Sequence, residues 1–109
     1  MFTMIPIQNL AALREHASEA VPLLKLLSNE DRLLLLCSMI ECERTVSELE
    51  TITGINQPTL SQQLGILRKA NVVSTRRDGK YIYYRVSDER ALLLMQTIHS
   101  LYCPEGFQP

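Results

Sequence analysis

Apolar residues recur at helical spacing through the first 42 residues of the chain. Over residues 9–27 they fall at steps of three and four, which predicts an amphipathic helix. Pro22 lies inside this stretch and is expected to kink or split the helix, because proline removes one helical hydrogen bond. A second helix is predicted over residues 29–42, with Ser28 as its N-cap. Its apolar stripe consists of Leu33, Leu36, Cys37 and Ile40.

A capping box opens the third predicted helix. The Thr45 hydroxyl and the Glu48 carboxylate can each accept a hydrogen bond from the other residue's backbone N–H, which favours a helix over residues 46–53. Gly54 is expected to end this helix, because glycine adopts the left-handed conformation of a C-terminal cap without a steric penalty.

The fourth predicted helix, over residues 57–70, follows after a very short turn. Asn56 is its candidate N-cap, and Pro58 falls in the first turn, where a missing N–H costs little. The buried positions of this helix are Leu60, Leu64 and Leu67. Two helices of this length joined by a tight turn are typical of a helix-turn-helix, whose second helix enters the major groove of DNA.

The hydrophobic period then changes to two. Two runs rich in β-branched and aromatic residues, VVSTRR and KYIYYRV, flank Asp78-Gly79, which predicts a β-hairpin over residues 72–86. A last helix is predicted over residues 88–103, capped by Ser87 and ended by the following proline. The fold class is therefore mainly α with a β-hairpin wing, a winged helix-turn-helix.

A chain of 109 residues with no repeat or flexible linker is expected to form a single winged-helix domain over residues 1–109. Its net charge of −1 conceals an uneven distribution. Residues 56–87 carry six basic side chains against Asp78 alone, whereas both flanking segments are net acidic. Such asymmetry is expected when one face meets phosphate, although a solvated charged face of a small α+β domain remains an alternative.

Polar and basic side chains gather on the predicted helix-turn-helix and wing. The first turn of the 57–70 helix is uncharged, and glutamine can bond adenine in two places while threonine offers a methyl group to thymine. The basic hairpin tip suits phosphate or minor-groove contact. The candidate DNA-binding residues are Gln57, Thr59, Ser61, Gln62, Gln63, Arg68, Arg76, Arg77 and Lys80.

The most distinctive stretches of the chain are VSELE, QPTLSQQLGILRKANVV and TRRDGKYIYYRV. They resemble the ArsR/SmtB family of winged-helix repressors, and the likeness covers roughly residues 20–104. The closing HSLYCPE resembles the thiol-based branch of that family, which responds to sulfide, persulfide or oxidants. The resemblance implies a homodimer, formed through the first and last helices, that binds an imperfect inverted repeat in operator DNA.

Three cysteines are candidates for chemistry. Cys37 and Cys42 lie about 140° apart around their predicted helix and cannot both face one partner. An apolar helix face and a helix C-terminus both disfavour the reactive thiolate, so the residues alone favour structural roles for Cys37 and Cys103. The family resemblance instead implies that oxidation or persulfide joins Cys37 to Cys103 and releases DNA, with Cys42 as an extra.

Other functions remain as alternatives. A member of this family can also act as an activator that displaces a silencing protein, or as a metal-responsive repressor. Asp88 and His99 match one metal-sensing pattern, but Arg90 replaces its first histidine, and one His with one Asp cannot close a zinc site. We therefore expect no metal or other cofactor.

The sequence also narrows the class and location of the protein. No Ser-His-Asp set, paired carboxylates or phosphate loop is visible, so we expect no enzyme activity. An odd number of cysteines without dense spacing, no signal-peptide pattern and no apolar run of about 18 residues predict a cytoplasmic protein outside the membrane.

Overall fold

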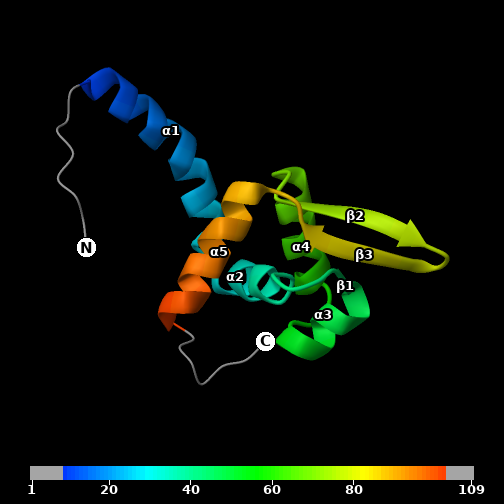
Figure 1. The fold of residues 1–109 in the computed structure, drawn as a ribbon. Helices are drawn as coiled ribbons and strands as arrows, with labels where there is room; N and C mark the ends of the chain where they lie inside the picture. Colours follow the sequence, from blue (N-terminus) through cyan, green and yellow to red (C-terminus); the bar gives the residue numbers. More distant parts are fainter. Residues whose placement is uncertain (1–8, 103–109) are drawn as a thin grey trace.

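The computed structural model describes residues 9–102, and it has the predicted winged-helix fold (Figure 1). Five helices and a small antiparallel sheet make up this part of the chain. The elements are α1 (Leu10–Leu27), α2 (Glu30–Cys37), β1 (Arg44–Thr45), α3 (Val46–Thr53), α4 (Thr59–Lys69), β2 (Val73–Asp78), β3 (Tyr81–Val86) and α5 (Glu89–Tyr102). Among these residues no helix is both long and apolar enough to cross a membrane.

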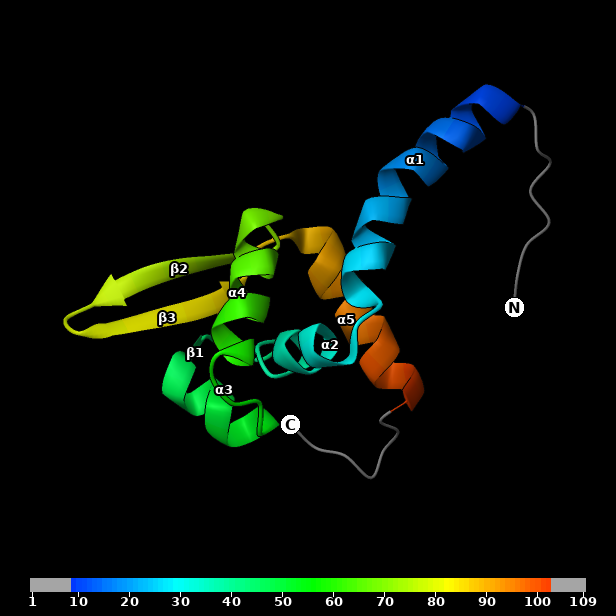
Figure 2. The ribbon, with the colours of Figure 1, turned by 180° about the vertical axis from the view of Figure 1, so that it is seen from behind.

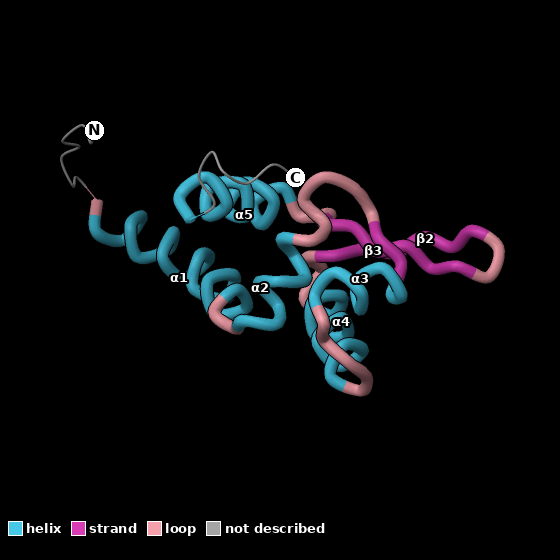
Figure 3. Tube along the Cα trace, turned by 90° about the horizontal axis from the view of Figure 1, so that it is seen from below, coloured by secondary structure: helices cyan, strands magenta, loops and turns pink. Residues whose placement is uncertain are grey.

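Seen from below, the hairpin of β2 and β3 projects from one end of the molecule and α1 from the other (Figure 3). The core lies between them, where α2, α3, α4 and α5 meet the base of the sheet. Its fully buried large side chains are Leu35, Leu36, Leu49, Leu60, Leu64, Leu67 and Met95. In α1, Leu27 is buried and Leu23 and Leu26 pack partly against the core, whereas the N-terminal part of this helix stands away from it (Figure 2).

The sheet has the order β1-β3-β2, and both pairings are antiparallel. The sequence did not predict β1, because a two-residue strand is too short to show a period. The predicted hairpin is confirmed, but its turn lies one residue later than expected. Asp78 pairs with Tyr81, so the two-residue loop is Gly79-Lys80. A left-handed φ at Gly79 but not at Lys80 fits a type II′ turn.

The helix α1 runs through Pro22 without a break, so the expected split does not occur. The carbonyl that loses its helical partner belongs to Ser18, four residues earlier. Ser18 and Pro22 are both exposed, so water can satisfy that carbonyl. The cost of proline is therefore lower here than inside a packed helix.

The helix α2 ends at Cys37, five residues before the predicted end at residue 42. The chain turns there because Arg44 must pair with β3, and its Nε donates to the carbonyl of Ser38 at 3.0 Å. The N-cap is Asn29 rather than Ser28, since the Asn29 side chain accepts a hydrogen bond from the Arg32 N–H.

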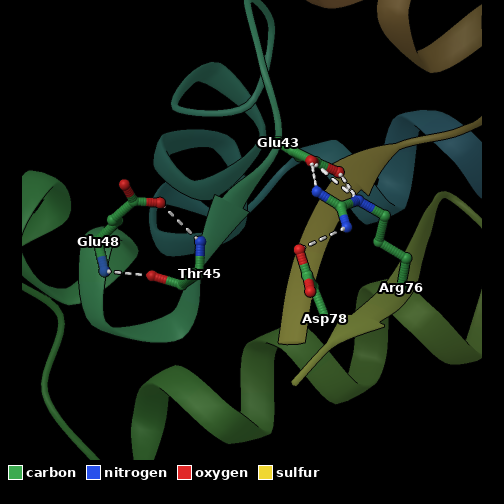
Figure 4. Close-up of polar contacts among 5 residues, drawn as sticks. All are labelled: Glu43, Thr45, Glu48, Arg76 and Asp78. Atoms are coloured by element: carbon green, nitrogen blue, oxygen red, sulfur yellow. Dashed lines mark hydrogen bonds and ion pairs between the residues drawn. The ribbon is translucent and has the colours of Figure 1, made fainter. Parts of the chain in front are cut away.

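The predicted capping box of α3 is present in full (Figure 4). The Thr45 N–H donates to Glu48 at 2.9 Å, and the Glu48 N–H donates to the Thr45 hydroxyl at 3.2 Å. Gly54 ends the helix with φ at 73°, as predicted. Both ends of this helix are therefore determined by local residues alone.

The other two helix starts differ from the prediction by one or two residues. The helix α4 begins at Thr59, and the Asn56 side chain does not cap it; the Gln57 side chain accepts from the Ser61 N–H at 3.1 Å instead. The helix α5 is capped by Asp88 rather than Ser87, because Asp88 Oδ1 accepts from two backbone N–H groups. The predicted end at Cys103 lies outside the described residues.

Candidate nucleic-acid interface

The helix α4 separates buried and outward residues cleanly. Leu60, Leu64 and Leu67 fall within a narrow arc and are buried in the core. At 100° per residue, the opposite side of the helix carries Gln62, Gly65, Ile66 and Lys69, all of which are exposed. In Figure 2 no described segment lies in front of α4, which leaves this outward face open to a partner.

The predicted DNA-binding residues of α4 occupy different parts of this surface. Ser61, Gln62 and Arg68 are exposed, and Thr59 is half-buried. Gln57 precedes the helix and is exposed, although its side-chain oxygen already accepts from the Ser61 N–H. The structure therefore brings most of the predicted residues to the outward side of α4 and its N-terminal approach.

Gln63 is engaged inside the molecule. Its side-chain oxygen accepts from Arg32 at 3.1 Å, and the Arg32 Nε donates to the carbonyl of Leu26 at 2.7 Å. Arg32 thus joins the end of α1 to α4 through α2. A two-point contact between Gln63 and adenine would require this oxygen to leave Arg32.

The wing contains a second internal link (Figure 4). Arg76 Nε lies 2.9 Å from both carboxylate oxygens of Glu43, and Arg76 Nη2 also donates to Glu43 Oε1. The other terminal nitrogen lies 3.7 Å from Asp78 Oδ2, and the guanidinium stacks 4.4 Å above the Tyr83 ring. Arg76 is therefore tied to the loop before β1, although its side chain stays half exposed.

This ion pair changes the electrostatics midway along the wing. The hydrogen bond from Arg76 lowers the pKa of Glu43, and the neighbouring positive charge acts in the same direction. The same hydrogen bond raises the pKa of Arg76. Because the two charges cancel locally, Arg76 attracts a phosphate group less strongly than an unpaired arginine.

Arg77 and Lys80 are exposed at the hairpin tip, and neither pairs with a carboxylate among the described residues. Lys80 lies over the Tyr81 ring, with 5.5 Å between the ammonium and the ring centre. Arg77 is directly opposite Ile82 in the sheet, on the face that Arg76 does not share. The available cations at the tip of the wing are therefore Arg77 and Lys80.

The list of candidate DNA-binding residues left out three residues of the outward face of α4, namely Gly65, Ile66 and Lys69. Lys69 lies 20° from Gln62 around the helix. A helical wheel that places the three buried leucines on the inner face would therefore have selected Lys69 as well as Arg68, or in preference to it. Gly65 lies between Gln62 and Lys69 in the sequence, in the middle of the helix. At such a position glycine lowers helix stability by about 1 kcal/mol relative to alanine. That cost is the signal that could have drawn attention to it.

The cysteines are placed only in part. Cys37 is the last residue of α2, half-buried against the core, and Cys42 is exposed in the following loop. Cys103 lies outside the described residues, so the geometry of the predicted pair is not defined. Within residues 9–102 no three or more His, Cys, Asp or Glu side chains are close enough to hold a metal ion.

This arrangement of helices and wing also occurs in known bacterial regulators. A sequence profile described as bacterial regulatory protein, arsR family, matches residues 29–75, from the cap of α2 into β2. The biofilm growth-associated repressor of Xylella fastidiosa is 44% identical over 96 residues, which cover 88% of this chain and 84% of that protein. The chain belongs to the ArsR family.

Other ArsR-family proteins are also similar to it. The crystal structure of the transcriptional repressor BigR from Xylella fastidiosa superposes with a TM-score of 0.83 at 42% identity, over 93% of this chain and 100% of that one. The transcriptional activator HlyU of Vibrio cholerae is 35% identical over 87% of this chain and 88% of its own length. This ArsR-family chain is therefore a transcription regulator with a DNA-binding fold, not an enzyme.

Proposed function

We propose that this ArsR-family regulator is a homodimeric repressor of transcription that binds an imperfect inverted repeat in operator DNA. The observation that carries the proposal is the outward face of α4, where polar residues and cations lie opposite three buried leucines. In a helix-turn-helix this face enters the major groove. Gln57, Thr59, Ser61 and Gln62 are suited to base edges, while Arg68, Arg77 and Lys80 are suited to phosphate.

Dimerisation is supported by a second surface, which is apolar. Large hydrophobic side chains of α1 and α5 are exposed, with Leu101 at 70% and Tyr102 at 78%. An isolated protomer gains by covering such a surface. A dimer through these two helices would present two copies of α4, and half-sites about one helical turn apart would match them. The exposed residues are Leu10, Leu13, Val21, Leu24, Leu93, Leu101 and Tyr102.

The proposed switch joins Cys37 to Cys103. With a low-molecular-weight persulfide as oxidant, the two thiols lose two electrons and form a protein disulfide, while the persulfide leaves as a thiol and hydrogen sulfide. A second persulfide molecule supplies the extra sulfur atom of a trisulfide bridge and itself leaves as a thiol. Another two-electron oxidant, such as a peroxide, would give the disulfide and water.

The position of Cys37 explains how the bridge would change DNA binding. Cys37 ends α2, which packs against both α4 and α5, and Cys103 follows the last residue of α5 directly. The same helix α2 holds Arg32, which bonds Gln63 of α4. A bridge that shifts α2 against α5 would therefore change the position of α4, and a shift of both reading helices would break their register on the two half-sites.

To test the switch, operator affinity is measured for the wild type, Cys103→Ser and the control Cys42→Ser, each reduced and after persulfide treatment. We expect treated wild type and treated Cys42→Ser to release DNA, whereas Cys103→Ser keeps its affinity. Mass spectrometry then reports the bridge and the cysteines used. Treated wild type that binds DNA as tightly as reduced protein would refute the switch.

The similarity to HlyU, a transcriptional activator, supports a second function. In it the same DNA-binding surface displaces a silencing protein and so raises transcription. Reporter expression in a deletion strain separates the two functions, because loss of a repressor raises expression and loss of an activator lowers it. The cytoplasmic location that the sequence predicts stays a prediction.

A further inference from the structure

We propose that Gly65 is the point where operator DNA comes closest to α4. The missing side chain would let the edges of the bases approach the helix backbone itself. The inference rests on the proposed DNA-binding function of α4 and adds a residue whose contribution is steric. A glycine contributes no hydrogen bond or charge, so DNA-contact reasoning based on side chains does not find it.

The fold of this chain gives no internal reason for a glycine at position 65. Apart from the two neighbouring residues and the adjacent backbone of α4 itself, an added Cβ would meet no atom within 4 Å in the part of the chain that the structure describes. Gly65 also lacks the positive φ that Gly54 and Gly79 adopt at their turns. Alanine would fit the same backbone and is the better helix former. The reason for the glycine therefore lies in something that approaches α4 from outside.

The neighbours of Gly65 indicate what approaches. On a helix, residues three and four positions away surround a given position, and here they are Ser61, Gln62, Arg68 and Lys69. Gln62, Gly65, Ile66, Arg68 and Lys69 line a shallow hollow on the helix surface. Its lining includes the backbone of Gly65 and the exposed side chain of Ile66, together with one amide and two cations. The amide and the two cations match a base edge flanked by phosphates.

The size of a major groove makes one methyl group significant. The groove is about 12 Å wide, and an α-helix with side chains measures about 10–12 Å across. One extra carbon on the facing side, about 1.5 Å from Cα, would hold the helix away from the bases. The Gln62 side chain would then no longer reach the base edges. The helices α1 and α5, which carry most of the exposed apolar residues, lie on the far side of α2 from α4 in Figure 3, so a second copy held by them would leave α4 open to DNA.

The test uses Gly65→Ala and the control Ser18→Ala. Ser18 is exposed in the middle of α1, so its change to alanine also favours the helix without altering α4. Two duplexes serve as probes: one that the wild type selects from a random pool, and a shuffled duplex of the same composition. Melting temperature, oligomeric state and affinity for both duplexes are measured for each protein.

We expect both variants to melt a few degrees above the wild type. Ser18→Ala should keep wild-type affinity, whereas Gly65→Ala should bind the selected duplex about tenfold more weakly, comparable to one mismatched base pair. Its affinity for the shuffled duplex should change less than about twofold, because phosphate contacts dominate there. Larger side chains, as in Gly65→Leu, should increase the loss on the selected duplex only.

Several outcomes would overturn the inference. Gly65→Ala could bind the selected duplex as tightly as Ser18→Ala does, or lose affinity equally on both duplexes. It could melt below the wild type, which would mean that the fold does need the glycine, or it could change oligomeric state, which would indicate a protein partner. In all four cases wild-type binding to the selected duplex leaves the proposed function standing. A wild type that selects no duplex refutes the proposed function itself.

Discussion

The two parts of the proposed interface are held in different ways. The helix α4 is fixed by three leucines buried in the core, and its outward side chains are largely unengaged. The wing projects from the body, and Arg76, an exposed arginine midway along it, is bound to Glu43 in the loop before β1. Packing therefore positions the base-reading element, whereas the wing relies on its strand pairing and on surface charge. The difference explains why Arg76 and Arg77, adjacent in sequence, are expected to have different roles.

The largest expected effect is on the anchoring of α4. Leu64→Ala removes a side chain that is 2% exposed and should lower the free energy of unfolding by about 2–5 kcal/mol, because it leaves a cavity in the core. Ile66→Ala, on the outward face of the same helix, should change it by less than about 1 kcal/mol. Urea unfolding measures both. Equal losses would show that the two faces of α4 do not differ in packing.

A smaller effect is expected at the link between α1 and α4. Arg32→Lys keeps the positive charge, but the lysine side chain cannot bond both the Leu26 carbonyl and the Gln63 side chain. The free energy of unfolding should therefore fall by about 1–2 kcal/mol. The control is Arg14→Lys at an exposed position of α1. If both variants unfold at the same urea concentration as the wild type, the link has no energetic role.

The two wing arginines give the next prediction. Arg77→Ala should reduce the dependence of the logarithm of DNA affinity on the logarithm of salt by about one unit, as expected for one lost phosphate contact. Arg76→Ala should reduce it by clearly less, because Glu43 already neutralises that charge. Anisotropy titrations over a salt series provide the measurement. A larger loss of slope for Arg76→Ala would reverse the assignment.

The smallest effect concerns pH. The folded state lowers the pKa of Glu43, so its ion pair stabilises the fold above the ordinary value of 4.5. This contribution is lost as the pH falls from there through the lowered value. Glu43→Gln should flatten the acid limb of the stability curve slightly, whereas Glu41→Gln, also in the loop after α2, should not. Identical acid limbs in thermal melts of both variants would contradict the prediction.

The sequence predicts best the elements that local residues determine. The bounds of α3 follow from a capping box and a glycine, and the register of α4 follows from three leucines. The starts of α2 and α5 were missed by one position because two adjacent polar residues could each serve as the cap. Here Asn29 and Asp88 take that role.

What the sequence could not predict depends on residues far apart in the chain. The end of α2 is set by Arg44 and its pairing with β3, and β1 itself exists only through that pairing. For the same reason no local pattern indicates that Gln63 bonds Arg32, 31 residues away, or that Arg76 bonds Glu43, 33 residues away. By residue type, Gln63 and Arg76 are both suited to DNA contact. Their bonds to Arg32 and Glu43 make them less available to bind DNA.

The central claim is that the outward face of α4 reads DNA. It is tested most directly by titrating the wild type and a Gln62→Ala/Lys69→Ala double variant against the duplex that the wild type selects. The account predicts that the double variant stays folded but binds at least about tenfold more weakly, since it loses one base contact and one phosphate contact. A folded double variant with wild-type affinity would contradict the account, because it would show that another surface binds the operator.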